Sequence, residues 1–156
     1  MKTENILKII IVVLVLIITA IAVFIMPQMA ENMANTYSEF AKLRYPGLIV
    51  VYISLIPLYI AILETWKLLK MAEAKEVFSE SSALSLDRIK YCTASIFVMY
   101  TISVFILLIL RVPFSAAYLT LIIAGLAMIA IALFASVLKK LLLIAINYKT
   151  ENELTI

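Results

Sequence analysis

The sequence predicts an all-α integral membrane protein, a four-helix bundle made of two helical hairpins. Its composition is 65% hydrophobic and 15% charged, with a mean hydropathy of +1.13, whereas soluble domains are about a quarter charged. The apolar residues form four continuous blocks, each long enough to cross a bilayer as a helix. Residues 66–92, the one long polar segment between the blocks, hold nine of the 23 charged residues. So much apolar surface on a small chain must face lipid.

The first block predicts a membrane span over residues 6–26, closed by Pro27. A basic start followed by an apolar run also describes a signal peptide. The run is longer than the roughly 7–15 residues of a typical signal core, and no clean cleavage site follows it. We therefore interpret the block as an uncleaved span.

The segment between Pro27 and Pro46 predicts an amphipathic helix on the outer side. Residues that recur at three- and four-residue steps form one, mainly apolar face, and polar residues take the other. The first face holds Met29, Met33, Tyr37, Phe40, Ala41 and Arg44. Such a helix lies at a membrane surface or covers the end of a bundle. Two interpretations stay open, a connector that covers the spans and a lid over a ligand or peptide site.

The second block predicts a span over residues 47–66. Tyr45, Tyr52, Tyr59 and Trp66 recur every seven residues, so these aromatic side chains share one helix face. Glu64 is the one acid in the block, close enough to the interface to be an ordinary solvated carboxylate. A proton or cation role is the alternative, and Glu64, Tyr59 and Tyr52 are then the candidate intramembrane polar site.

Residues 67–90 predict a cytoplasmic stalk formed by extensions of the second and third helices. No helix breaker occurs between Trp66 and Phe78, which predicts about three further turns, ~18 Å. Ser79–Ser82 offers N-caps for the next helix. The two extensions are expected to pack antiparallel through Leu69, Ala72, Val77, Phe78, Leu84 and Ile89.

The third and fourth spans are expected at residues 91–110 and 115–138, joined by a short turn at Arg111–Pro113. In the fourth span, Ala116, Thr120 and Ala124 form one ridge of small residues, and Ala132 and Ser136 another. Such ridges let helices approach closely. Residues 139–156 are then a cytoplasmic tail, held against the membrane or the stalk.

The distribution of basic residues predicts the orientation. The two termini and the central segment carry ten Lys and Arg residues, and the other two connections carry three. Because cytoplasmic segments are enriched in Lys and Arg, both termini and the stalk are expected in the cytoplasm of a multi-pass protein of the bacterial plasma membrane.

The composition also limits the chemistry. The chain has no histidine and a single cysteine, Cys92, which excludes His- or Cys-based metal sites, a Ser-His-Asp triad and an intrachain disulfide. The spans contain no Asp and no Gly-flanked Ser. The sequence therefore predicts a protein that is not an enzyme and that carries no metal or cofactor.

Five segments carry a family resemblance: Tyr37–Pro46 (YSEFAKLRYP), Lys67–Leu69 (KLL), Phe78–Glu80 (FSE), Ile89–Cys92 (IKYC) and Glu151–Ile156 (ENELTI). Their order and spacing, over nearly the whole chain, resemble an uncharacterised family of four-span membrane proteins common in Bacillota. Members are typically encoded beside a small helix-turn-helix regulator of the Cro/repressor type. The resemblance implies the fold and a regulatory context, and it supplies no catalytic residues.

Two functions are therefore weighed. The first is a regulatory or interaction protein that binds a cytoplasmic protein, such as a helix-turn-helix regulator, through its stalk and tail. Its candidate docking residues are Lys67, Lys70, Phe78, Ser79, Leu154 and Ile156, the last two as a strand added to a sheet or as a frayed tail. The alternative is a small transporter, channel subunit or immunity-type protein acting in the bilayer, where a homodimer would complete the path. Besides the lipid bilayer, no direct nucleic-acid partner is expected.

Overall fold

The computed structural model describes residues 2–155, and its regular structure is entirely helical. The elements are α1 (Lys2–Ala20), a π-helical turn η1 (Ile21–Ile25), α2 (Met26–Thr36), α3 (Ser38–Ala41), α4 (Arg44–Glu73), α5 (Glu80–Ile109) and α6 (Ala116–Leu154). Four stretches are long and apolar enough to cross a membrane: Thr3–Thr36, Arg44–Glu73, Glu80–Ile109 and Ala116–Leu154. The predicted all-α fold with four spans is confirmed.

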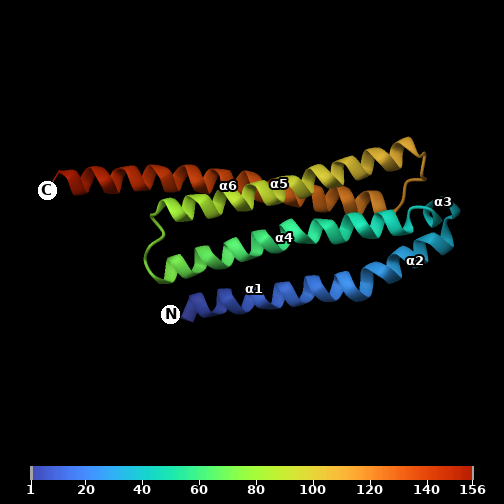
Figure 1. The fold of residues 1–156 in the computed structure, drawn as a ribbon, viewed down its shortest axis with the longest axis horizontal. Helices are drawn as coiled ribbons and strands as arrows, with labels where there is room; N and C mark the ends of the chain where they lie inside the picture. Colours follow the sequence, from blue (N-terminus) through green and yellow to red (C-terminus); the bar gives the residue numbers. More distant parts are fainter. Residues whose placement is uncertain (1, 156) are drawn as a thin grey trace.

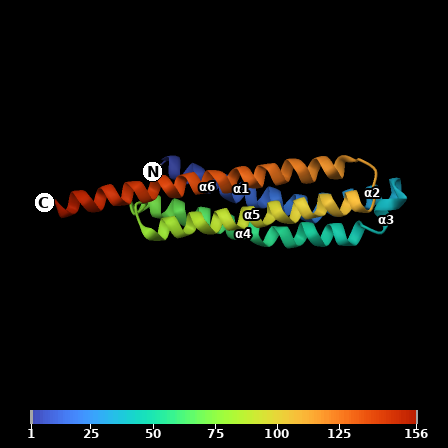
Figure 2. The same ribbon diagram turned by 90° about the horizontal axis from the view of Figure 1, so that it is seen from above.

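The helices lie side by side in an elongated bundle (Figure 1), with α1 against α4 and α5 against both α4 and α6. The two chain ends and the turn at residues 74–79 lie at one end of the bundle, which we call the terminal end. The short helices α2 and α3 and the turn at residues 110–115 lie at the other, the cap end (Figure 2). At the terminal end, α6 extends beyond the 74–79 turn (Figure 1).

Small residues bring α5 and α6 together in the most extensive helix–helix contact of the bundle. Gly125 is buried on α6, and a Cβ added there would lie 3.6 Å from the Phe97 ring, an ordinary van der Waals distance, so this position is packed closely against α5. Ala132 is buried, as its predicted ridge requires, whereas Ala116 and Thr120 are exposed. Large apolar side chains cover the outside of the bundle, because lipid is their solvent.

Pro27 does not end the first helix, which corrects the sequence-based boundary at Met26. The helix runs on to Thr36 because η1 changes the hydrogen-bond register just before the proline. In η1 the Met26 N–H bonds to the Ile21 carbonyl, five residues back. The next donor in that register would be the nitrogen of Pro27, which carries no hydrogen. The hydroxyl of Tyr52 on α4 donates instead to the Ala22 carbonyl, at 3.1 Å.

The predicted outer amphipathic helix is divided. Tyr37 has an extended backbone (φ −127°, ψ 116°) that separates α2 from the short α3. Met29, Met33 and Phe40 nevertheless face a common cavity, as their spacing indicated.

Both long connections begin with the same turn. Lys75 and Arg111 adopt positive φ angles of 59° and 53°, and each follows a helix closed by 6→1 and 5→2 backbone hydrogen bonds. This is the Schellman motif, in which glycine usually occupies the left-handed position. The motif ends α4 at Glu73, about two turns beyond Trp66, rather than at Phe78 as predicted.

Candidate functional site

A buried carboxylate organises the terminal end of the bundle. Glu64 on α4 is only 4% exposed, so the expectation of an ordinary solvated carboxylate was wrong. Its oxygens accept hydrogen bonds from the Ser85 hydroxyl at 2.9 Å, the Lys67 ammonium at 2.7 Å and the Arg88 guanidinium at 3.0 Å. Lys67 and Arg88 are themselves more than half exposed. We call these four residues the Glu64 cluster.

Further ion pairs connect neighbouring helices at this end of the bundle. Asp87 on α5 accepts a hydrogen bond from Lys139 on α6 at 2.5 Å and lies 3.7 Å from the Lys90 ammonium. Lys8 on α1 pairs with Glu73 on α4. Opposite charges therefore connect each long helix to a neighbour, and they fix the relative register of α4, α5 and α6. Because these carboxylates are already paired, the arrangement supports a structural role better than proton transfer.

The structure does not bring the candidate polar residues Glu64, Tyr59 and Tyr52 together. Tyr52 and Tyr59 face the first helix, where Tyr52 bonds the Ala22 carbonyl and the Tyr59 hydroxyl lies 2.7 Å from Thr19 Oγ1. Glu64 faces α5 instead. Tyr52 and Tyr59 thus bond to η1 and α1, whereas Tyr45 of the same repeat is 69% exposed. The carboxylate belongs to a different interface.

The candidate docking residues have different surroundings. Lys67 belongs to the Glu64 cluster, and the Ser79 hydroxyl caps α5 by accepting from the Ser82 N–H. Lys70 and Phe78 are exposed. Leu154 is the last residue of α6, so it is helical and not part of an extended strand. It is 82% exposed. Ile156 lies outside the described residues.

The stalk helices contact each other, and α6 adds to their packing. Ala83, Leu86 and Leu142 form a buried cluster, with Leu68, Val77 and Ile146 packed around it. The tail segment after Lys139 is therefore held against the stalk, one of the two predicted placements. Phe78 and Leu84 were expected inside this contact but are 54% and 58% exposed. Leu84 lies outside the α5 face that buries Ala83, Leu86 and Ile89.

The face of α6 that lies opposite Leu142 and Ile146 carries unpartnered apolar residues. Leu141, Ile144 and Tyr148 are exposed, at steps of three and four residues that place them on one face. They follow Lys139 and Lys140, where the sequence predicts the fourth span to end. We call these three residues the α6 stripe, and exposed Lys140 and Lys149 flank it.

Sequence reasoning missed the partners of Glu64. Ser85 and Arg88 are three residues apart on α5 and so lie on one face, a pattern visible in the sequence. Nothing in the sequence, however, indicated which register of α4 and α5 would set that face against Glu64. Leu141 and Ile144 were seen as part of the tail, but not as an exposed stripe.

These features define a four-span α-helical membrane protein, without an indication of enzymatic chemistry among its described residues. The chain belongs to the family described as "Protein of unknown function (DUF2975)", which matches residues 28–156. It is also similar to "Uncharacterized membrane protein YoaS" of Bacillus subtilis (strain 168), with 34% identity over 154 residues, 96% of this chain and 95% of that protein. No solved structure matches the chain. The resemblance to an uncharacterised bacterial membrane family is confirmed, and the neighbouring regulator stays a prediction.

Proposed function

We propose that this protein is a non-enzymatic, membrane-anchored interaction protein that binds a soluble cytoplasmic protein through the α6 stripe. The observation that carries the proposal is the exposure of Leu141, Ile144 and Tyr148 on a helix beyond its predicted span. Contiguous apolar side chains exposed to water mark interaction surfaces. The excess of Lys and Arg at the terminal end supports a cytoplasmic location for it.

The spacing of the stripe suggests the shape of the partner. Leu141, Ile144 and Tyr148 stand at i, i+3 and i+7, the pattern by which an amphipathic helix enters an apolar groove. Lys140 and Lys149 on either side favour a groove with an acidic rim. The partner is therefore a soluble protein with such a groove, and a helix-turn-helix regulator is the type that the family resemblance implies.

Photo-crosslinking in living cells tests the proposal. A photoreactive residue at position 144 is expected to trap a soluble protein, whereas the same residue at the lipid-facing position Ile123 traps none. The trapped protein, once purified, should bind the detergent-solubilised chain and should lose at least about tenfold in affinity when Leu141, Ile144 and Tyr148 are all changed to Ser.

A matched variant distinguishes binding through the α6 stripe from binding through neighbouring apolar side chains. Leu154→Ser removes an exposed apolar side chain six residues beyond the stripe, and binding should be unchanged. Crosslinks from position 144 to lipid alone, or to a second copy of the chain, would assign the stripe to the bilayer or to a homodimer and overturn the proposal.

Activity within the bilayer is the less supported alternative. A transporter or channel needs a polar path through its spans. The carboxylate of Glu64 is occupied by Ser85, Lys67 and Arg88. Two cavities among the described residues are lined almost wholly by apolar side chains. A flux or toxin-sensitivity assay that changes in Glu64→Gln, with folding intact, would favour this alternative.

A further inference from the structure

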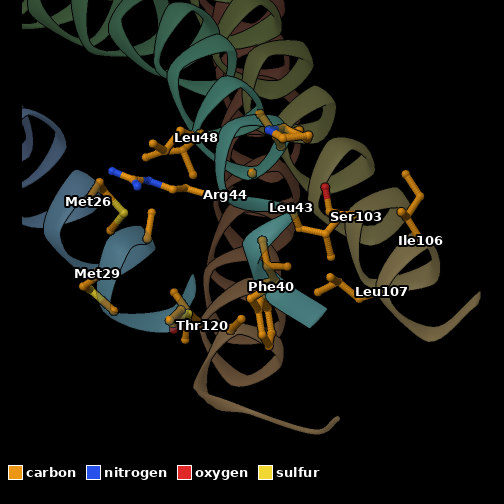
Figure 3. Close-up of a pocket in the computed structure, with 18 residues that line it drawn as sticks. Met26, Met29, Phe40, Leu43, Arg44, Leu48, Ser103, Ile106, Leu107 and Thr120 are labelled. Carbon is orange, nitrogen blue, oxygen red and sulfur yellow. The ribbon is translucent and has the colours of Figure 1, made fainter. Parts of the chain in front are cut away.

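The cap end of the bundle contains a cavity, which is independent of the proposed function. Residues of α2, α3, α4, α5 and α6 surround this cavity of about 250 Å³. Figure 3 shows Met26 and Met29 on one side, Phe40 and Leu43 at the cap, and Ile106 and Leu107 on α5. Its position, beside the first turns of α4 and α6 and the last turns of α5, corresponds to one edge of the membrane-spanning region.

The lining is apolar apart from three side chains, and two of these are already satisfied. The Ser103 hydroxyl donates to the Met99 carbonyl and the Thr120 hydroxyl to the Ala116 carbonyl, each within its own helix. They therefore offer little to a ligand. The cavity suits a hydrocarbon chain.

Arg44 is the third polar side chain, and it is the one charged residue in the lining. Its Nε is buried and has no hydrogen-bond partner among the described residues. Its terminal nitrogen lies 3.8 Å from a Glu31 carboxylate that is itself more than half exposed, too far for a hydrogen bond. A buried guanidinium N–H without an acceptor is costly, and it is a ready donor for an anionic oxygen.

From this combination we infer that the cap-end cavity binds an anionic membrane phospholipid, with one acyl chain among the methionines and leucines and a phosphate oxygen on Arg44. An apolar cavity with a single cation at its edge matches an amphiphile with one negative head. Guanidinium donors pair well with phosphate oxygens. Lipid is the ligand already present at that depth, and a cavity of about 250 Å³ takes part of one acyl chain and leaves no room for a second. On this view α2 and α3 form a lid over a ligand site, the second of the two interpretations of that segment.

Native mass spectrometry of the full-length protein in mild detergent tests the inference, with phosphatidylglycerol, phosphatidylethanolamine and oleate as probes. We expect phosphatidylglycerol to bind about tenfold more tightly than the other two. Arg44→Gln should abolish this preference. Lys42→Gln, which removes an exposed charge at the same end outside the lining, should preserve it.

A filling variant tests the cavity itself. Gly47 lines it, and a Cβ at this position would meet nothing within 4 Å. Gly47→Leu raises helix propensity, so the protein should fold, yet it should bind phosphatidylglycerol at least about tenfold more weakly. Equal binding of phosphatidylglycerol by the parent chain and Arg44→Gln, or tighter binding of oleate, would overturn the inference.

Discussion

At the scale of single residues, the hydroxyl of Tyr52 compensates for a hydrogen that Pro27 lacks. The π register of η1 leaves the Ala22 carbonyl without its backbone donor, and Ala22 is buried. In a bilayer no water replaces the missing donor. Tyr52 therefore allows a proline-containing helix to continue from the span into the cap.

The substitution Tyr52→Phe should lower the free energy of unfolding by about 1–2 kcal/mol, because it leaves a buried carbonyl unpaired. Tyr59→Phe is the matched control. It should cost less, because Thr19 keeps its hydrogen bond to the Val15 carbonyl at 2.7 Å. Denaturant unfolding of both variants in detergent micelles measures the difference, and equal costs would contradict this account of η1.

Glu64→Gln should destabilise the bundle by about 1–2 kcal/mol. The amide keeps an acceptor for Ser85 but loses the charge that strengthens the bonds from Lys67 and Arg88. This loss of stability is modest because Lys67 and Arg88 are more than half exposed and can be hydrated instead. Glu76→Gln, at an exposed position in the 74–79 turn, is the control and should leave stability unchanged.

Residue-level prediction from the sequence succeeded where the signal was local and failed where it depended on a neighbour. The seven-residue aromatic repeat correctly placed Tyr52 and Tyr59 on one face. The burial of Glu64 could not be predicted, because it depends on Ser85 and Arg88 from another helix. The buried Nε of Arg44 depends in the same way on how α2 and α3 fold over α4.

At the scale of elements, the ends of α4 and α5 are strained in the same way. The left-handed conformation costs a residue with a Cβ about 1–2 kcal/mol, and Lys75 and Arg111 both adopt it. Each of Lys75→Gly and Arg111→Gly should therefore stabilise the protein, by about 0.5–1 kcal/mol after the added freedom of glycine in the unfolded chain is counted.

Lys140→Gly is the opposing control, since it places glycine inside α6 at an exposed position. It should destabilise by about 1 kcal/mol. Thermal unfolding in detergent distinguishes the three variants. Destabilisation by all of them would show that side chains, and not backbone conformation, determine the stability of the two turns.

The existence of the helices was predictable and their ends were less so. Apolar blocks longer than 18 residues specify spans, whatever surrounds them. The end of α4 at Glu73 was missed because neither Ala74 nor Lys75 is a helix breaker by residue type. The continuation past Pro27 was missed because a proline usually closes a helix, and the register shift that accommodates it has no sequence signature of its own.

At the scale of the whole molecule, the charge distribution predicts an orientation that cysteine labelling can check. In a Cys92→Ala background, a cysteine at position 42 should react with a membrane-impermeant maleimide in intact cells. Cysteines at positions 76 and 153 should react only after permeabilisation, because ten of the 13 basic residues lie at their end. The reverse pattern would place the α6 stripe outside the cell.

The bundle as a whole followed from composition and block length. The packing of α6 against the stalk at the terminal end did not. The sequence could not show that Leu142 and Ile146 of α6 would pack against the stalk while Phe78 and Leu84 stay exposed, because both outcomes depend on how α6 lies against α5.

The π-helical turn η1 affects how the first helix tolerates the loss of one residue. One residue advances a helix by about 100°, and η1 accommodates one residue more than an α-helical turn would. Deleting one residue from Ile21–Ile25 would remove this extra residue and restore a continuous α-helix with α2 in nearly the same angular phase. A deletion in α2 before Met29 would instead rotate the residues that follow by about 100°. Met29 and Met33 would then turn away from the cavity. The angular phase between the first span and the cap is thus set by a count of residues, and η1 is a turn in which one residue can be lost with little change in that phase.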